Sequence, residues 1–248
     1  MSFKDHFSGH ASDYARYRPH YPTEMFAQLA SLAPARQLAW DCATGNGQAA
    51  VALAPYFARV IATDASGQQI ENAAPNERIE YRVAPAESSG LEAGTIDLIN
   101  VAQALHWFDI SAFFAEAERV LKPDGVLAVS AYNLLTVAPE IDAVVNRFYF
   151  ETTGPYWPPE RELVEAGYQT IAFPFRELEL PRFHMQTGWN LGHLLGYLRT
   201  WSATKKFTAG NGYDPVDSLG QELRRLWGDE HQLREVRWPM TLRVFRKP

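Results

Sequence analysis

Short apolar segments alternate with helix-patterned segments through the first 132 residues of the chain. Five apolar segments have the length and composition of β-strands, namely residues 37–42, 59–64, 78–84, 95–102 and 126–132. Four segments carry apolar residues at helical spacing, namely residues 23–32, 48–54, 67–74 and 110–121. The stretch KPDG, residues 122–125, has the composition of a turn before the fifth strand. Because strands that alternate with helices form a parallel sheet, the pattern predicts an α/β fold with helices on both faces.

The regular alternation of strand and helix patterns ends after Tyr132. Helices are predicted near residues 141–150, 159–166, 189–203 and 216–228. Segments 171–180 and 240–247 have the pattern of strands, and Pro174 places the first of them at a sheet edge or bulge. We expect these strands to pair antiparallel beside the parallel sheet. The intervening helices then lie over its carboxyl edge as a lid, where ligands bind in open α/β sheets.

The composition narrows the class of protein. Of the 248 residues, 46% are hydrophobic, which is enough for one domain with a substantial core. The net charge of −6 leaves no strongly basic footprint, so we expect no nucleic-acid partner. The N-terminus lacks the apolar stretch of a signal peptide, and no segment has the pattern of a membrane span. The single cysteine, Cys42, fits a reducing compartment, so we expect a cytoplasmic protein without a membrane partner.

The stretch DCATGNGQAA, residues 41–50, places two glycines two residues apart between a predicted strand and a predicted helix. Glycine lets ligand atoms approach the backbone, and GNGQAA fits the dinucleotide pattern G-x-G-x-x-A. Asp64 lies 23 residues beyond Asp41, a spacing that suits an acid holding a ribose diol. None of the eleven tyrosines has a lysine four residues on, which disfavours a short-chain hydride-transfer enzyme. An NAD(P)-dependent oxidoreductase of Rossmann type nevertheless remains an alternative.

Further along, VAPAESSGLEAGTIDLINVAQALHWFD precedes AERVLKPDGVLAV. Together with DCATGNG and Asp64, and in this order, these stretches resemble the class I S-adenosylmethionine-dependent methyltransferases. The stretches YARYRPHYP and LLGYLRTWSA are similar to the small-molecule branch that includes the trans-aconitate methyltransferases. The resemblance implies a doubly wound, mostly parallel, seven-stranded Rossmann-like sheet with a helical lid. It divides the single methyltransferase domain, 1–248, into a cofactor-covering segment (1–34), a cofactor-binding core (35–132) and C-terminal strands with lid helices (133–248).

The same resemblance implies where S-adenosylmethionine binds. The residues expected to hold this cofactor are Tyr14, Arg18, Asp41, Ala43, Gly45, Gly47, Asp64, Ala86, Glu87, Ala102 and Gln103. Asp64 takes the ribose hydroxyls in this scheme, and the Gly45–Gly47 backbone cradles the methionine part. Ala43 departs from the family's usual glycine, and a methyl group fits there if the backbone is not left-handed.

The acceptor is expected to be a small molecule, and a carboxylate is the simplest hypothesis because it needs no deprotonation. His106 either orients or deprotonates the acceptor, or is simply hydrogen-bonded in its loop. The predicted substrate-binding residues are Trp107, Tyr197, Arg199 and Trp201, with Arg182 as a second cationic candidate. His6 and His10 lack a third ligand, so we expect no metal. A non-catalytic protein that binds S-adenosylmethionine is the second alternative.

Overall fold

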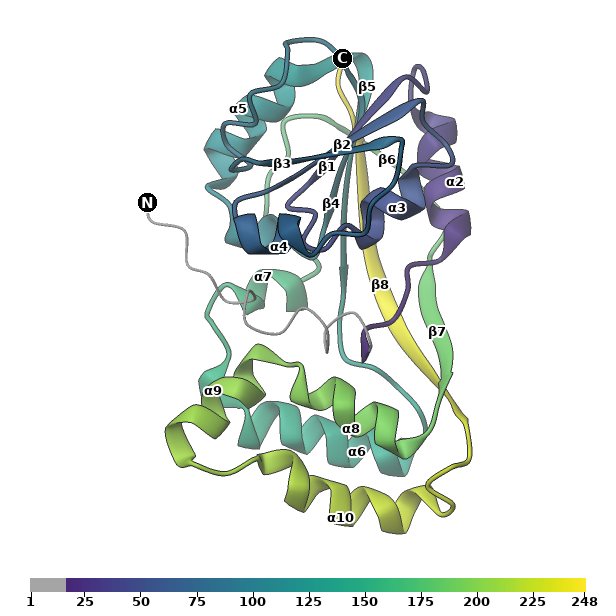
Figure 1. Ribbon diagram of the computed structural model, residues 1–248, viewed down its shortest axis with the longest axis vertical. Helices are drawn as coiled ribbons and strands as arrows, with labels where there is room; N and C mark the ends of the chain where they lie inside the picture. The colour runs from purple at the N-terminus through teal and green to yellow at the C-terminus, as the bar shows by residue number, and fades with distance from the viewer. Residues whose placement is uncertain (1–16) are drawn as a thin grey trace.

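Eight strands form a mixed sheet. The structure is a computed structural model, and it describes residues 17–248. The strands are β1 (Leu38–Cys42), β2 (Arg59–Asp64), β3 (Ile79–Val83), β4 (Ile96–Ala102), β5 (Leu121–Tyr132), β6 (Arg176–Leu178), β7 (His184–Trp189) and β8 (Arg234–Arg246). Their order is β3-β2-β1-β4-β5-β8-β6, and β7 pairs with β8 off this path (Figure 1). The pairings among β1 to β5 are parallel, whereas those with β8 are antiparallel. The predicted doubly wound fold is therefore confirmed, with one strand more than the seven expected.

Helices surround this sheet and form a separate layer beyond its carboxyl edge (Figure 1). The helices are α2 (Thr23–Leu32), α3 (Gln48–Leu53), α4 (Gly67–Glu71), α5 (Ile110–Val120), α6 (Pro139–Arg147), α7 (Arg161–Glu165), α8 (Leu191–Arg199), α9 (Ser202–Asn211) and α10 (Pro215–Trp227). Single turns lie at η2 (Leu105–Trp107), η3 (Phe148–Thr152) and η4 (Gly154–Tyr156). The apolar sides of α2 and α3 pack on one face of the sheet, and those of α5 and α7 pack on the other.

The layer beyond the carboxyl edge has its own apolar core, built mainly from α6, α8 and α10. Trp227 and Trp238 are both fully buried in it. The indole N–H of Trp238 donates to the hydroxyl of Tyr197, 3.2 Å away, so the polar end of this large ring is satisfied. Buried aromatic area of this size holds the lid helices against the extended end of β8 as one packed unit.

Two local predictions need correction, and one strand was missed. The stretch 122–125 lies within β5 as a bulge, because Ile96 pairs with Leu121 and Leu98 with Val126. Residues 189–203 do not form one helix: Trp189 ends β7, and Trp201, extended at ψ 135°, separates α8 from α9. Strand β7 itself was not predicted, although its inward residues Met185 and Trp189 alternate with exposed ones.

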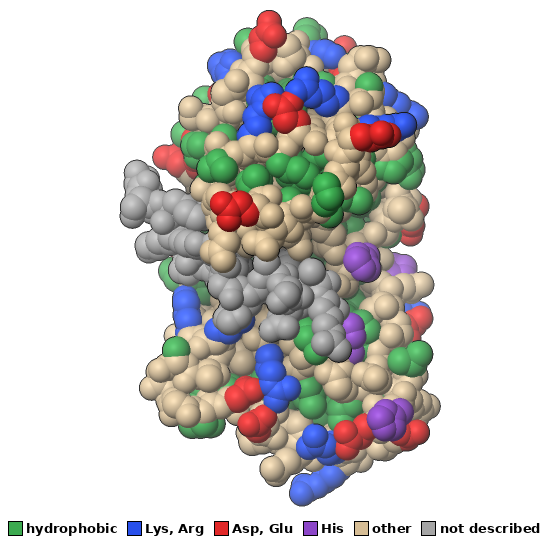
Figure 2. Space-filling view, in the orientation of Figure 1, with side chains coloured by type: hydrophobic (Ala, Val, Ile, Leu, Met, Phe, Trp, Pro, Cys, Tyr) green, Lys and Arg blue, Asp and Glu red, His purple; other side chains and the backbone are tan. Residues whose placement is uncertain are grey.

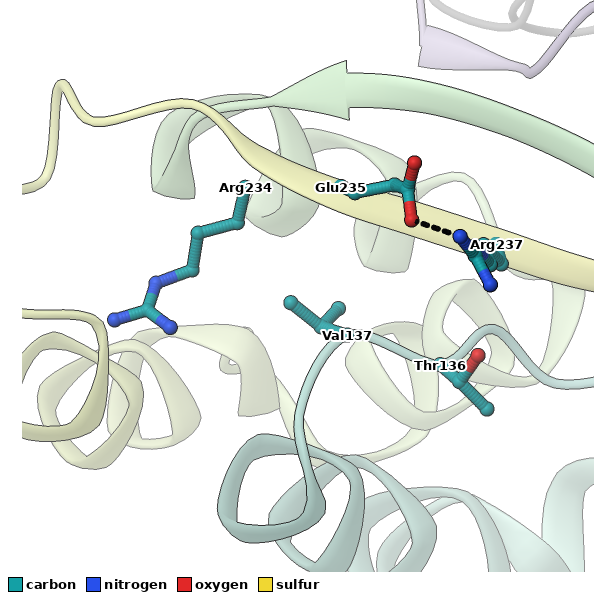
Figure 3. A pocket seen from close by; sticks show the side chains of 5 residues that line it. All are labelled: Thr136, Val137, Arg234, Glu235 and Arg237. Atoms are coloured by element: carbon teal, nitrogen blue, oxygen red, sulfur yellow. Dashed lines mark ion pairs between the residues drawn. The ribbon is translucent and has the colours of Figure 1, made fainter.

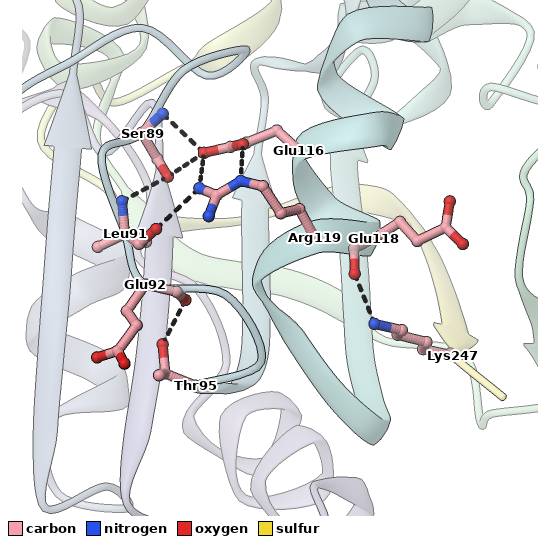
Figure 4. Close-up of polar contacts among 8 residues, drawn as sticks. All are labelled: Ser89, Leu91, Glu92, Thr95, Glu116, Glu118, Arg119 and Lys247. Carbon is pink, nitrogen blue, oxygen red and sulfur yellow. Dashed lines mark hydrogen bonds and ion pairs between the residues drawn. The ribbon is translucent and has the colours of Figure 1, made fainter.

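An ion pair between the buried Glu116 and the exposed Arg119 fixes the loop that follows β3 (Figure 4). The carboxylate of Glu116, on α5, accepts hydrogen bonds from the Ser89 backbone N–H at 2.9 Å and from Arg119 Nε at 2.7 Å. Arg119 also donates to the carbonyl of Leu91 at 2.8 Å. Hydrogen bonds from Arg119 lower the pKa of Glu116 to about 2, so this carboxylate is charged at neutral pH. The cluster anchors the loop that carries Ala86 and Glu87 to α5.

The surface is mixed in charge. On the face shown in Figure 2, Lys and Arg side chains are interspersed with Asp and Glu over both halves of the described molecule. Such a pattern is typical of a solvated surface rather than of a nucleic-acid footprint. Within residues 17–248, every helix is too short or too polar to cross a bilayer.

Candidate active site

The carboxylate of Asp41, at the end of β1, is buried in the turn that carries the two glycines. Its Oδ1 accepts from the Asn100 amide at 2.7 Å, and its Oδ2 accepts from the Thr44 hydroxyl. Burial raises the pKa of Asp41 to about 6, although both hydrogen bonds oppose that shift. Asp41 therefore ties the turn to the neighbouring strand β4.

Three residues of the turn adopt a left-handed backbone: Ala43 at φ 54°, Gly45 at 57° and Gly47 at 87°. Gly45 leaves open space where a Cβ would project, since the nearest atom, of Gln69, is 4.0 Å away. A Cβ at Gly47 would instead overlap the ring of Tyr81. Ala43 is left-handed, so the condition under which its methyl group fits is not met, and the methyl group strains the turn.

Asp64, at the end of β2, faces this turn from the neighbouring strand. Its Oδ2 accepts from the Gly45 backbone N–H and its Oδ1 from that of Ser66, both at 2.9 Å. Asp64 thereby brings a carboxylate to the glycine turn at the carboxyl edge of the sheet. Further along the edge Ala86 is buried, and Glu87 accepts from the Asp109 backbone N–H at 2.9 Å.

Gln103 follows Ala102 at the end of β4 and is also left-handed, at φ 58°. Its backbone N–H donates to Ser130 at 2.8 Å and its side chain to the Tyr132 carbonyl at 3.0 Å, so β5 holds it in place. A strained non-glycine residue at the carboxyl end of a central strand is typical of a functional site.

These features suit S-adenosylmethionine. The glycine turn exposes backbone to an amino-acid group, and Asp64 presents a carboxylate beside it, the group that suits a ribose diol. The anchored loop with Ala86 and Glu87 provides an edge for a base. Of the residues expected to bind this cofactor, Tyr14 lies outside the described residues. His6 and His10, which were considered as metal ligands, lie outside them as well.

A cavity of about 80 Å³ opens beside Gln103, between the sheet edge and the lid. Four aromatic residues form one wall, Tyr149, Trp157, Tyr197 and Trp201. Their ring centroids lie 4.9 Å apart for Tyr149 and Trp157, and 5.9 Å apart for Tyr197 and Trp201. The predicted substrate residues Trp107, Tyr197 and Trp201 all line this cavity.

Two guanidinium groups lie against the aromatic wall. Arg161 lies over the ring of Trp157, with its Cζ 5.2 Å from the centroid, and Arg18 lies over Tyr197 at 5.2 Å. Arg18 Nη1 also donates to the Tyr132 hydroxyl at 2.9 Å. Among the described residues that line the cavity, none is Asp or Glu. The cavity is thus apolar along one side and positively charged.

The structure does not bring Arg199 to this cavity. Its Nε lies 2.5 Å from Asp214 and its Nη2 lies 2.7 Å from Asp217, on the outer side of the lid. Arg182, the second candidate, is exposed and does not line the cavity either. Arg161 takes the place expected for Arg199. Sequence reasoning missed Arg161, Trp157 and Tyr149, and the only available signal was an arginine close to an aromatic cluster in YFETTGPYWPPER.

His106 lines the same cavity and is buried. Its Nδ1 lies 3.0 Å from the hydroxyl of Tyr168. Burial, and to a smaller extent the positive charge of Arg161, lowers the pKa of His106 to about 3. The imidazole is therefore neutral at neutral pH.

A larger cavity, of about 430 Å³, lies between the loop at Thr136 and strand β8 (Figure 3). Its charged groups are engaged with one another or with the backbone. Arg237 pairs with Glu235 at 2.6 Å, and Arg234 donates to the Trp227 carbonyl at 3.0 Å. None of its five lining residues borders the smaller cavity, so it does not belong to the site at the sheet edge.

The sheet order, the left-handed glycine turn and Asp64 define a nucleoside-binding α/β domain. A family model described as a methyltransferase domain matches residues 40–129. A Dictyostelium discoideum protein named as a methyltransferase is 33% identical over 253 residues, covering 99% of this chain and 96% of that protein. The solved structure of a protein assigned as a type II methyltransferase, from Anaeromyxobacter dehalogenans, has 44% identity and a TM-score of 0.88, covering 93% of this chain and 98% of that one.

A shorter match, 28% identical over 131 residues, is to a Saccharomyces cerevisiae protein named as an S-adenosylmethionine-dependent methyltransferase, and it covers 49% of this chain and 45% of that protein. The chain belongs to the class I S-adenosylmethionine-dependent methyltransferases. Its cofactor is S-adenosylmethionine.

Proposed function

We propose that this methyltransferase acts on a carboxylate oxygen of a small-molecule acceptor bound in the aromatic cavity beside Gln103. The observation that carries the proposal is the guanidinium of Arg161 in a cavity with no acidic side chain among its described lining residues. The terminal amino groups of Arg161 have no hydrogen-bond partner within residues 17–248. An arginine in this state suits a carboxylate, which two parallel N–H groups can bind.

A second donor supports an anionic ligand. The indole N–H of Trp157 is buried and has no hydrogen-bond partner within the described part of the chain. Buried donors are nearly always paired, so this group points to an acceptor atom on a bound molecule. The similarity of LLGYLRTWSA to the trans-aconitate methyltransferases agrees with this reading, since Tyr197 and Trp201 of that stretch line the cavity.

The resemblance to the class I methyltransferases supports the following roles for the other site residues along the sheet edge. Asp64 holds the ribose, the Gly45–Gly47 backbone holds the methionine part of the cofactor, and Ala86 with Glu87 borders the adenine. Ala102 and Gln103 lie at the methionine end, next to the acceptor cavity. Arg18 holds the carboxylate of the cofactor.

The reaction needs little from the protein beyond placement. When bound, S-adenosylmethionine supplies an electrophilic methyl group, whose transfer to a carboxylate oxygen gives a methyl ester and S-adenosylhomocysteine without any proton transfer. Arg161 and the aromatic wall orient the carboxylate and exclude water, which are the main sources of acceleration for such a displacement. His106 is neutral, and a carboxylate acceptor carries no proton that His106 would have to remove. The role of His106 is therefore to shape the cavity.

A turnover assay tests the proposal. The protein, S-adenosylmethionine and a panel of aliphatic and aromatic acids are incubated, and both S-adenosylhomocysteine and methyl esters are measured. We expect turnover with at least one acid. Arg161→Met should raise KM for that acid by roughly 10- to 100-fold, the range for hydrogen bonds to a charged group. Arg199→Met, which removes an arginine of the outer lid, should leave KM unchanged.

Two outcomes would contradict the proposal in different ways. Cofactor binding without product from any acid would favour a non-catalytic S-adenosylmethionine-binding protein or a different acceptor class. Equal KM values for wild type and Arg161→Met would show that the acceptor binds elsewhere.

A further inference from the structure

A π-helical turn, η3, places Tyr149 at the cavity. It follows α6 directly and is closed by the backbone N–H of Thr153, which donates to the carbonyl of Phe148 at 2.9 Å. The buried hydroxyl of Thr153 caps the same turn, at 3.1 Å from the carbonyls of both Phe148 and Tyr149. Turns of this kind are rare, and inside a helix they frequently occur at functional sites.

The hydroxyl of Tyr149 connects two charged groups of α7. Arg161 Nε donates to it at 2.9 Å, and the hydroxyl donates to Glu165 Oε1 at 2.5 Å. Burial raises the pKa of Tyr149 to about 12, so the hydroxyl keeps its proton and both directions of donation are fixed. Arg161 uses only Nε in this chain of bonds, which leaves its two terminal nitrogens available to a ligand in the cavity that it lines.

The ring of Tyr149 restrains the guanidinium as well. Arg161 Cζ lies 5.8 Å from the centroid of Tyr149 and 5.2 Å from that of Trp157. An arginine side chain loses considerable rotamer freedom when it is fixed, and that loss normally opposes ligand binding. Here the loss is already incurred in the folded protein.

We propose that Tyr149 is a positioning residue, which acts through Arg161 to orient the carboxylate of the acceptor, with Glu165 fixing the Tyr149 hydroxyl from behind. The inference rests on the proposed carboxylate acceptor. It assigns the orientation of the acceptor carboxylate to a relay of three side chains, of which Arg161 alone donates hydrogen bonds to the ligand.

A double-mutant cycle tests this role, with the acid that turns over best in the panel as the probe. Tyr149→Phe should raise KM for the acid about fivefold, the effect of losing one hydrogen bond, and leave kcat within about twofold. In the Arg161→Met background the same change should have no further effect, because a residue that acts through Arg161 is silent once Arg161 is absent. The dissociation constant of S-adenosylmethionine should be unchanged in every variant.

Two further variants separate positioning from a loss of folding. Glu165→Leu removes the exposed end of the relay without disturbing the buried ring, and it should raise KM about two- to threefold, less than Tyr149→Phe. Tyr156→Phe is the matched control, because its hydroxyl accepts from Asn211 at 2.7 Å and lies outside the cavity lining. Tyr156→Phe should leave KM unchanged.

The outcomes are distinguishable. If the acid turns over and Arg161→Met raises KM, but Tyr149→Phe does not, the positioning role is overturned and the proposed function stands. If Tyr149→Phe raises KM equally with and without Arg161, Tyr149 acts on its own and the relay is overturned. If no acid turns over, the proposed acceptor fails and the inference fails with it.

Discussion

The hydroxyl of Tyr168 lies 3.0 Å from Nδ1 of His106, and both side chains are buried next to the acceptor cavity. Burial lowers the pKa of His106 to about 3 from its ordinary value of 6.5. At pH values between about 3 and 6.5, the folded protein therefore binds fewer protons at His106 than the unfolded chain does. His106 stays neutral throughout the pH range in which most enzymes are assayed.

When kcat is measured as a function of pH at saturating cofactor and acceptor, we expect no step from His106 between pH 5.5 and pH 8. The ring proton shifts of His106, followed by NMR, should be constant over the same range. An inflection near pH 6.5 that disappears in His106→Gln would contradict the assignment, because it would identify His106 as a titrating base.

Replacing Ala43 by glycine should stabilise the protein. The left-handed φ of 54° costs an L-residue about 1–2 kcal/mol, and glycine removes that strain while adding about 0.5–1 kcal/mol of unfolded-state entropy. We expect Ala43→Gly to raise the free energy of unfolding by about 0.5–1 kcal/mol. Chemical denaturation measures this change.

A glycine in the helix that follows is the matched control. Ala52→Gly, within α3, should lower the free energy of unfolding by about 1 kcal/mol. If both substitutions destabilise the protein to the same extent, Ala43 is not strained in solution.

Replacing Asp64 by alanine should weaken the binding of S-adenosylmethionine by about 1–3 kcal/mol, the range for hydrogen bonds to a charged group. Isothermal titration calorimetry measures the dissociation constant. Asp217→Ala, which removes an exposed acid from the lid, should leave the affinity unchanged. Unchanged affinity in Asp64→Ala would refute the assignment of the ribose to this residue.

Replacing Glu116 by glutamine should destabilise the protein in a pH-dependent manner. The pKa of Glu116 is lowered to about 2 in the folded state from 4.5, so its charged form contributes stability above pH 4.5. That contribution is lost as the pH falls from 4.5 toward 2. At pH 7 we expect a loss of about 1–3 kcal/mol in Glu116→Gln, and the difference from wild type should shrink in acid.

Glu118→Gln is the control for this prediction, because Glu118 is an exposed neighbour on the same helix. Its substitution should change the free energy of unfolding by less than about 0.5 kcal/mol. A pH-independent difference between wild type and Glu116→Gln would show that the charge of Glu116 is not what stabilises the loop.

The parallel half of the fold could be predicted closely from the sequence. The segment predicted as the second strand, 59–64, is β2, and α2 covers the predicted residues 23–32. These elements are buried runs with strong periodicity, so local pattern and tertiary packing agree.

The acceptor end of the site could not be predicted in the same way. Arg199 and Arg161 have similar local surroundings in the sequence, each close to tyrosine and tryptophan. Asp214 and Asp217 engage Arg199, and they come from the start of α10, so this competition exists only in the folded lid. Arg161 reaches the cavity through a π turn and a short helix, and neither has a distinctive sequence pattern.

The decisive experiment is a crystal structure of the protein with S-adenosylhomocysteine and the preferred acid. We expect the ribose at Asp64, the amino-acid part along Gly45–Gly47, and the carboxylate of the acid on the guanidinium of Arg161. A nucleoside bound away from Asp64, or an acid that makes no contact with Arg161, would contradict it.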